Sequence, residues 1–246
     1  MKLKCSVLTI WLLLLVTTSG ISQESRLLSK PGHFPEMHGV IEKPSTPGTH
    51  PPVIILYGSQ GWRPIYATIA KNLADSGFVA LALDYRAYAD DNSGETGDLA
   101  VWHRWQSSVR SAISFLMEDT STVKGSVGLL GYSLGAILSV SVAASIPEVK
   151  AVVNFFGCGS ADKKELESQV RNFPPLLILH GEEDQTISVL AAYALRDAVM
   201  AQGGEVEIKI YPGAAHGFNA TWLPNYNEAY ANDSFQRTVD FFRRKL

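Results

Sequence analysis

Short apolar runs that recur along the chain restrict its fold more than any other feature. They alternate with longer stretches of amphipathic, helical spacing, and most are apolar at every position rather than at every second one. A strand of this composition is buried on both faces, as in a parallel sheet covered by helices. Regular alternation of such strands with helices is typical of layered α/β domains. The sequence therefore predicts an α/β fold with a mostly parallel central sheet and helices on both faces.

The boundaries of the expected elements follow from the spacing of apolar residues and from glycines and prolines. Strands are expected at about Met37–Ile41 and at Pro52–Tyr57, Phe78–Leu83, Ser126–Leu130, Val149–Phe155, Leu176–Leu179 and Val206–Tyr211. Helices are expected at Tyr66–Ser76, Leu99–Glu118, Leu134–Ser145, Val189–Gln202 and about Asn232–Arg244. The longer connections are Asp84–Asp98 and Gly157–Pro174.

Composition narrows the class of protein. The chain has 246 residues, of which 46% are hydrophobic and 18% charged, and its formal net charge is −3. This apolar content excludes a disordered chain and supports a large core. With 21 basic against 24 acidic residues, no basic excess is present to neutralise phosphates, so nucleic acid is not an expected partner. No internal repeat or linker divides the chain, and one domain is expected over residues 23–246.

The N-terminal segment predicts export. Lys2 and Lys4 precede the apolar run Cys5–Val16, and small residues follow at Thr17–Ser22. This is the layout of a secretory signal peptide, and the apolar run is too short to span a bilayer comfortably. We expect residues 1–22 to be removed and the protein to be secreted or periplasmic, without a membrane span after cleavage. The alternatives are an uncleaved membrane anchor and a buried N-terminal element.

The pentapeptide Gly131-Tyr132-Ser133-Leu134-Gly135 matches G-x-S-x-G between a predicted strand and a predicted helix. A serine on such a sharp turn has a strained backbone, and its neighbours two residues away must lack side chains to avoid collision. The helix N-terminus below it favours developing negative charge, and the amide of Leu134 can serve as an oxyanion donor. The alternative is a glycine-rich turn in which Ser133 only caps the helix.

Two further motifs offer partners for a serine nucleophile. The segment LLILHGEEDQTI carries Asp184 after a predicted strand, and EIKIYPGAAHGF ends in a loop that carries His216. A serine alcohol needs a neutral imidazole, and the imidazole needs a carboxylate to orient it. The order Ser133, Asp184, His216 is that of α/β-hydrolases. The alternatives are a turn residue for Asp184 and a satisfied loop histidine for His216. His180 is expected to be a buried histidine that is hydrogen-bonded to the backbone.

From about Val53 onward the sequence resembles the dienelactone hydrolase family of the α/β-hydrolase superfamily. The segments GLLGYSLGA, PPLLILHGEEDQTIS and VEIKIYPGAAHGFN carry the resemblance. It implies an α/β-hydrolase fold without a large lid domain, with Asp184 as the acid and His216 as the base, while Glu182 and Glu183 are helpers or solvated charges. It also implies that the amide of Ser59 is the second oxyanion donor; the competing interpretation of that segment is a plain tight turn.

The sequence also departs from the family pattern. Relatives carry a histidine at the position of Tyr57, and dienelactone hydrolases proper use a cysteine where this chain has Ser133. Their carboxylate-binding arginine follows the next strand, whereas Arg86 lies nearby in a different register. Chlorocatechol-type lactones are therefore doubtful substrates. Arg86 and Trp62 are the candidate substrate contacts, and Trp102, Trp105 and Trp222 are further candidates for an apolar pocket wall.

These observations predict a serine hydrolase that cleaves a small-molecule carboxylic ester or lactone through Ser133, His216 and Asp184. A serine peptidase or amidase of the same fold keeps the triad and changes the leaving group. A non-catalytic binding protein on a hydrolase scaffold is the third hypothesis. No sequence feature calls for a cofactor, and no metal-ligand spacing is present.

Overall fold

The computed structural model describes residues 26–27, 37–87, 98–160 and 162–246. Within these ranges one sheet has the strand order β1-β2-β4-β3-β5-β6-β7-β8. Its strands are β1 (Arg26–Leu27), β2 (His38–Glu42), β3 (Pro52–Leu56), β4 (Val79–Leu83), β5 (Val127–Tyr132), β6 (Val149–Phe155), β7 (Leu176–Gly181) and β8 (Val206–Tyr211). Neighbours from β4 to β8 in this order pair in parallel, and β2 is antiparallel to both β1 and β4. The prediction of a mostly parallel sheet is confirmed.

Burial follows the composition of each strand. Every residue of β3, β4, β5 and β7 is buried, as their continuous apolar sequences predict. The edge strand β8 reads VEIKIY, and only its last residue, Tyr211, is buried. The parallel pairing aligns the C-terminal ends of β3, β5, β7 and β8 at one edge of the sheet. Loops that follow these strands therefore meet at this edge.

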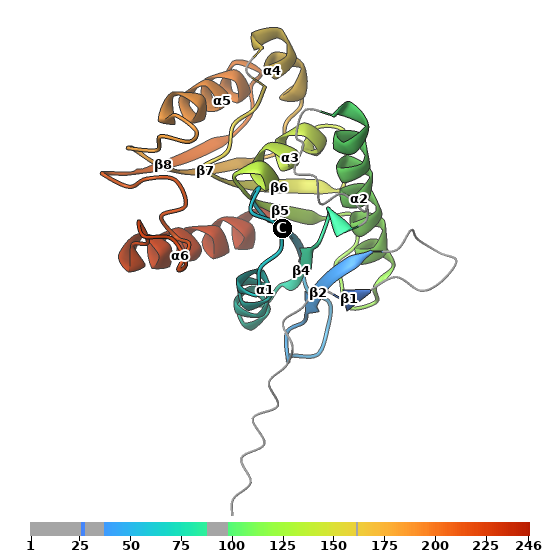
Figure 1. Ribbon diagram of the computed structural model, residues 1–246. Coiled ribbons are helices and arrows are strands. Elements are labelled where there is room, and N and C mark those ends of the chain that lie inside the picture. The colour runs from blue at the N-terminus through green and yellow to red at the C-terminus, as the bar shows by residue number, and fades with distance from the viewer. Residues whose placement is uncertain (1–25, 28–36, 88–97, 161) are drawn as a thin grey trace, which may run out of the picture.

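Helices cover both faces of the sheet, as predicted (Figure 1). They are α1 (Ile65–Asp75), α2 (Leu99–Glu118), α3 (Leu134–Ala143), α4 (Lys163–Gln169), α5 (Val189–Ala201) and α6 (Glu228–Lys245). Figure 1 shows α1 and α6 on one side and α2, α3, α4 and α5 on the other. In the described part of the connection 157–174, only the short helix α4 is present, and no lid domain.

Two differences from the prediction have local causes. The sequence of α4, KKELESQ, contains one buried side chain, Leu166, so it has no apolar period to indicate a helix. Helix α6 begins at Glu228 rather than Asn232, because the side chain of Asn227 accepts a hydrogen bond from the amide of Tyr230 and caps the helix. Helix α4 and the short strand β1 were not predicted.

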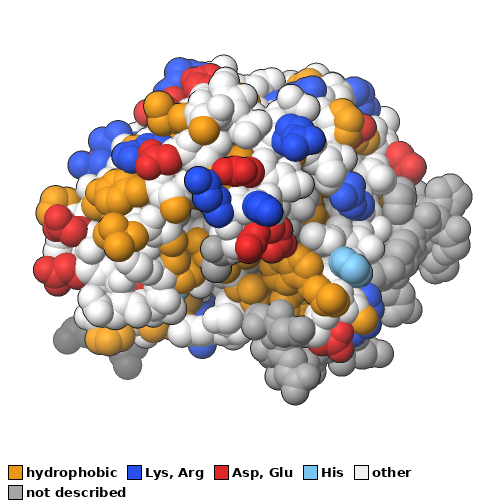
Figure 2. All heavy atoms as spheres, turned by 90° about the horizontal axis from the view of Figure 1, so that it is seen from above, with side chains coloured by type: hydrophobic (Ala, Val, Ile, Leu, Met, Phe, Trp, Pro, Cys, Tyr) orange, Lys and Arg blue, Asp and Glu red, His pale blue; other side chains and the backbone are white. Residues whose placement is uncertain are grey.

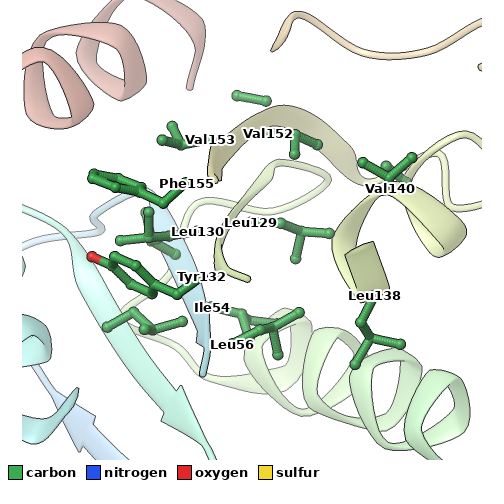
Figure 3. Packing of buried hydrophobic residues seen from close by; sticks show 14 of the residues in the cluster. Ile54, Leu56, Leu129, Leu130, Tyr132, Leu138, Val140, Val152, Val153 and Phe155 are labelled. Atoms are coloured by element: carbon green, nitrogen blue, oxygen red, sulfur yellow. The ribbon is translucent and has the colours of Figure 1, made fainter. Parts of the chain in front are cut away.

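Helix α3 packs on the centre of the sheet, against β3, β5 and β6. Figure 3 shows Leu129 and Leu130 of β5 beside Val152 and Val153 of β6, with Leu138 of α3 opposite Leu56 of β3. All of these side chains are buried. The tight packing of α3 fixes the turn that joins it to β5, and this turn carries Ser133.

On the face shown in Figure 2, basic and acidic side chains are interspersed and form no continuous basic area. The predicted signal peptide at residues 1–22 lies outside the described residues. Among the residues that the structure describes, no helix has the length and apolar character needed to cross a membrane.

Candidate active site

Ser133 occupies a strained turn between β5 and α3. Its backbone has φ 51° and ψ −115°, a conformation that residues other than glycine seldom adopt. Its amide donates a hydrogen bond to the carbonyl of Phe155 over 2.9 Å, which ties the turn to the end of β6. The strain is maintained because β5 and α3 are both buried in the core. The turn holds the Ser133 side chain above the sheet edge.

The two glycines of the motif are required by close packing. A Cβ atom on Gly131 would lie 2.4 Å from the Cα of Ala136, and one on Gly135 would lie 2.2 Å from the carbonyl oxygen of Leu56. Real Cβ atoms do not approach backbone this closely. The glycines therefore allow α3 to start directly against β3 and β5, as the motif predicts.

Gly135→Ala is expected to destabilise the protein. The added methyl group meets the backbone of β3, which cannot move without disturbing the centre of the sheet. We expect the free energy of unfolding to fall by about 3 kcal/mol, the upper part of the range for overpacked cores. Urea denaturation followed by circular dichroism measures this change. An unfolding midpoint equal to that of the wild type would contradict the close approach of α3 to β3.

The three candidate catalytic side chains meet at the sheet edge. His216 Nε2 lies 3.0 Å from Ser133 Oγ, and His216 Nδ1 lies 2.7 Å from Asp184 Oδ2. Asp184 Oδ2 accepts the hydrogen bond from His216 Nδ1, so Nδ1 carries the proton. His216 Nε2 is then free to accept the proton of the serine hydroxyl. The arrangement is a nucleophile, a base and an acid in hydrogen-bond contact.

The loops after β7 and β8 hold the acid and the histidine. Asp184 Oδ1 accepts hydrogen bonds from the amides of Thr186 and Ile187, each over 2.8 Å. Glu182 accepts a hydrogen bond from the amide of Gly213 over 3.1 Å and so links the two loops. The rings of Phe156 and His216 pack in a T-shaped arrangement, with 4.8 Å between their centroids. The backbone of His216 also accepts a hydrogen bond from the side chain of Asn225.

His180 is a contact of Asp184 that the sequence did not reveal. Its side chain is fully buried and Nε2 donates a hydrogen bond to the carbonyl of Ile187 over 2.8 Å, which confirms the predicted buried, backbone-bonded histidine. The same nitrogen lies 3.4 Å from Asp184 Oδ2. Asp184 is thus flanked by two histidines. Burial raises the pKa of the Asp184 carboxyl. The hydrogen bonds from His180, His216 and the amide of Ile187 lower this pKa by more than burial raises it, so the net pKa is well below the usual range.

The low pKa of Asp184 predicts how stability depends on pH. An aspartate in the unfolded chain takes up a proton near pH 4, whereas folded Asp184 does so only at lower pH. Its contribution to stability is therefore present above about pH 4 and is lost as the pH falls below that value. We expect the melting temperature of the wild type to fall more steeply below about pH 4 than that of Asp184→Asn. Parallel curves from thermal melts between about pH 7 and pH 3 would contradict this account.

The turn after β3 lies beside Ser133. The amide of Gly61 donates a hydrogen bond to the carbonyl of Gly58 over 3.1 Å, which closes a tight turn around Ser59 and Gln60. A Cβ atom on Gly58 would lie 3.4 Å from Ser133 Cβ. Leu134 is the first residue of α3, so its amide has no acceptor within the helix. The two segments that carry the expected oxyanion donors, Ser59 and Leu134, therefore flank the nucleophile.

Tyr57, which directly precedes this turn, is held in place by Asp84 and Tyr85. Its hydroxyl donates a hydrogen bond to Asp84 Oδ1 over 2.7 Å, and its ring stacks on Tyr85 with 4.4 Å between centroids. The hydroxyl of Tyr85 donates to the carbonyl of Tyr57 over 3.0 Å. Burial, followed by the nearby Asp84 carboxylate, raises the pKa of Tyr57 far above its usual range, so the phenol stays protonated.

Arg86 contacts the turn and not the substrate pocket. Its guanidinium group donates a hydrogen bond to the carbonyl of Ser59 over 3.0 Å and lies 5.7 Å from the centroid of the Trp105 ring. Arg86 is not among the residues that line the pocket beside Ser133, so its position does not support the expectation that it binds substrate.

The pocket beside Ser133 has a volume of about 200 Å³. Trp222 lines it, whereas Trp62 does not and instead packs edge-on against Tyr57, with 6.3 Å between ring centroids. The indole nitrogen of Trp222 donates a hydrogen bond to Gln60 over 2.9 Å, which connects the turn after β3 to the loop after His216. Trp102 and Trp105 pack against each other in α2, away from this pocket. Of the four candidate tryptophans, Trp222 alone lines the pocket.

In the described ranges, no group of three or more His, Cys, Asp or Glu side chains is arranged to hold a metal ion.

Comparison with known proteins gives one family and several relatives. A model of the dienelactone hydrolase family matches residues 37–246. A protein of Methylorubrum extorquens, described as "Putative carboxymethylenebutenolidase", is 27% identical over 230 residues, which cover 86% of this chain and 79% of the relative. A protein of Escherichia coli with the same description is 30% identical over 122 residues, or 47% of this chain. That match spans only 45% of the relative's length.

Solved structures share the fold. A "Putative Dienelactone Hydrolase" from Klebsiella pneumoniae has a TM-score of 0.77 at 22% identity and covers 89% of this chain and 98% of its own. An esterase from Thermogutta terrifontis has a TM-score of 0.73 at 18% identity and covers 90% of this chain and 93% of its own. These similarities confirm the α/β-hydrolase fold that the sequence predicted.

Proposed function

The chain belongs to the dienelactone hydrolase family, and from this premise we propose that it is a serine hydrolase that cleaves a carboxylic ester or lactone. The observation that carries the proposal is the continuous chain of contacts from Ser133 Oγ through His216 to Asp184, at 3.0 Å and 2.7 Å. Both distances are in the range at which an imidazole can take the proton of a serine hydroxyl while a carboxylate orients it.

The first half of the reaction forms an acyl-enzyme. Ser133 Oγ attacks the carbonyl carbon while its proton passes to His216 Nε2, and the positive imidazolium is stabilised by Asp184. The carbonyl oxygen becomes negative and is held by the amides of Leu134 and Ser59. The tetrahedral intermediate then expels the alkoxide, which takes the proton from His216. The acyl group remains on Ser133, and in a lactone the released alcohol stays attached to it.

The second half returns the enzyme to its starting state. His216 takes a proton from water, and the hydroxide oxygen attacks the acyl carbon. Collapse of the second intermediate breaks the bond to Ser133 Oγ, which regains a proton from His216. The net reaction is the addition of one water to one ester bond.

Matched substrates test this proposal. We expect the purified protein to hydrolyse 4-nitrophenyl butyrate, with turnover of the matching butyryl 4-nitroanilide lower by at least about 100-fold, because an amine is a poorer leaving group and needs a well-placed proton donor. Equal or faster turnover of the anilide would favour a serine peptidase or amidase of the same fold. No turnover of either compound would favour a binding protein.

We also propose that residues 1–22 direct export and are removed. The support is the sequence Lys2–Lys4, the apolar run Cys5–Val16 and the small residues before Gln23. Expression of the full chain in a bacterium with separate assays of periplasm and cytoplasm tests this. The proposal predicts a periplasmic protein that begins near Gln23 by mass spectrometry, and a full-length protein in the membrane fraction would indicate an uncleaved anchor.

A further inference from the structure

His216 is the one acidic or basic side chain in the described lining of the pocket beside Ser133. Its described lining contains no Asp, Glu, Lys or Arg side chain. Most of the lining is apolar or aromatic, as in Ile65, Tyr66 and Phe156, and the polar groups are neutral, as in Gln60 and Asn219. A carboxylate that enters such a pocket loses its hydration and gains no cation in return, which is strongly unfavourable.

Two arginine side chains lie near the pocket but outside its lining. Arg86 donates to the carbonyl of Ser59 and lies over Trp105. The guanidinium carbon of Arg63 lies 5.2 Å from the centroid of the Trp222 ring. Neither side chain is part of the pocket lining. A charged group on the substrate therefore finds no opposite charge beside the nucleophile.

A second hollow adjoins this pocket between α1 and α6. It has a volume of about 360 Å³ and shares four lining residues with the pocket, namely Ile65, Ile69, Tyr132 and Asn219. Its other walls include Phe155 at the end of β6 and Ala231 and Phe235 of α6. The described lining of this hollow also contains no charged side chain. The two hollows are therefore neighbours on the side of α1, and neither has an Asp, Glu, Lys or Arg side chain in its described lining.

We propose that the substrate is a neutral ester or lactone with an apolar chain of several carbons, and that this chain lies in the hollow between α1 and α6. The inference rests on the proposed serine hydrolase function and specifies its substrate class. Ile65 and Ile69 line both the pocket and the hollow, so a chain attached to the reacting carbonyl or to its alcohol contacts apolar side chains in both. The other side chains of the hollow are apolar or neutral polar groups. Burial of each methylene group against the apolar side chains contributes to binding.

The charge part of the proposal is tested with two esters of equal length. In 4-nitrophenyl pentanoate the acyl chain ends in a methyl group, and in the 4-nitrophenyl monoester of glutaric acid it ends in a carboxylate. We expect kcat/KM to be at least about 100-fold higher for the pentanoate, because a site without a partner for a charge rejects it. Equal or faster hydrolysis of the glutarate would overturn the proposal and leave the serine hydrolase function standing. Hydrolysis of neither ester would contradict the proposed function itself.

The second hollow is tested by filling it. Ala231 is half-buried on α6 and lines the hollow, whereas Ala229 is exposed on the same helical turn and lines neither hollow. Ala231→Phe and Ala229→Phe are therefore a matched pair. The substrates are 4-nitrophenyl butyrate and decanoate for acyl chains, and methyl and hexyl butyrate for alcohol chains.

The expected result is a loss of chain-length preference in one variant. In at least one of the two series, Ala231→Phe lowers the ratio of kcat/KM for the long chain to that for the short chain by about 10-fold, the scale of one or two buried methylene groups. Ala229→Phe keeps the wild-type ratio in both series. If the ratios of Ala231→Phe equal those of the wild type in both series, the assignment of the chain to this hollow is wrong.

Discussion

Ser133→Ala is expected to lower kcat/KM for 4-nitrophenyl butyrate by at least about 10⁴-fold, the scale seen when a triad nucleophile is removed. The variant keeps the turn, the oxyanion donors and the His216–Asp184 pair, but it has no oxygen at the position 3.0 Å from His216 Nε2. No acyl-enzyme can form, and only direct attack by water remains. Alanine at this strained position is sterically similar to serine, so the loss is chemical.

A serine on the same helix serves as the control. Ser141 lies in α3, where its hydroxyl donates to the carbonyl of Leu138 and accepts from Gln106. Ser141→Ala is expected to keep kcat/KM within about 3-fold, because hydrogen bonds of this kind contribute only modestly to stability. Steady-state kinetics of both variants at equal active concentration provide the test. A Ser133→Ala protein that retains wild-type activity would remove Ser133 from the mechanism.

Asp184→Asn is expected to lower kcat by about 10³ to 10⁴-fold, as loss of the orienting carboxylate does in other triads. The asparagine fills the same volume, but it carries no charge to stabilise the imidazolium. Its amide NH₂ group also competes with the carbonyl oxygen for His216 Nδ1, which favours the wrong tautomer. The effect falls mainly on kcat, since the pocket beside Ser133 is not lined by Asp184.

The neighbouring acidic residue gives a matched comparison. Glu183 is exposed in the same loop, and Glu183→Gln changes the charge by the same amount without touching His216. We expect its kcat to remain within about 3-fold of the wild type, because exposed charges interact weakly with a site they do not contact. Equal losses in the two variants would show that the charge of the loop, and not the Asp184–His216 hydrogen bond, is what matters.

Much of the fold could be predicted from the sequence, because a strand that is buried on both faces of the sheet is apolar at every position. Strands such as β3 and β4 are apolar at every position, and the observed boundaries of β6, β8 and α2 are those predicted. Helix α4 was missed because it buries only Leu166 and therefore has no apolar period. The start of α6 depends on a side-chain cap by Asn227, which is a local interaction that periodicity does not reveal.

In the candidate site, too, some residues could be predicted from the sequence and others could not. Ser133, Asp184 and His216 each lie in a motif with a local chemical reason, so their positions could be predicted one at a time, and the structure brings them into contact. The support around them depends on contacts between distant segments. Arg86 binds the carbonyl of Ser59 across 27 positions, and Trp222 donates to Gln60 across 162 positions. The contact of His180 with Asp184 is short in sequence, but the curvature of a loop sets it. None of these contacts leaves a pattern in the sequence.

The most direct test of the account is covalent labelling with a fluorophosphonate, followed by peptide mass spectrometry. An activated serine displaces fluoride and keeps the phosphonyl group on its oxygen. We expect one adduct per molecule, located on Ser133, with loss of esterase activity in proportion to labelling. We also expect no adduct in Ser133→Ala and a much slower reaction in Asp184→Asn. An active protein that is not labelled, or one labelled at a residue other than Ser133, would contradict the assignment of Ser133, His216 and Asp184 as the catalytic residues.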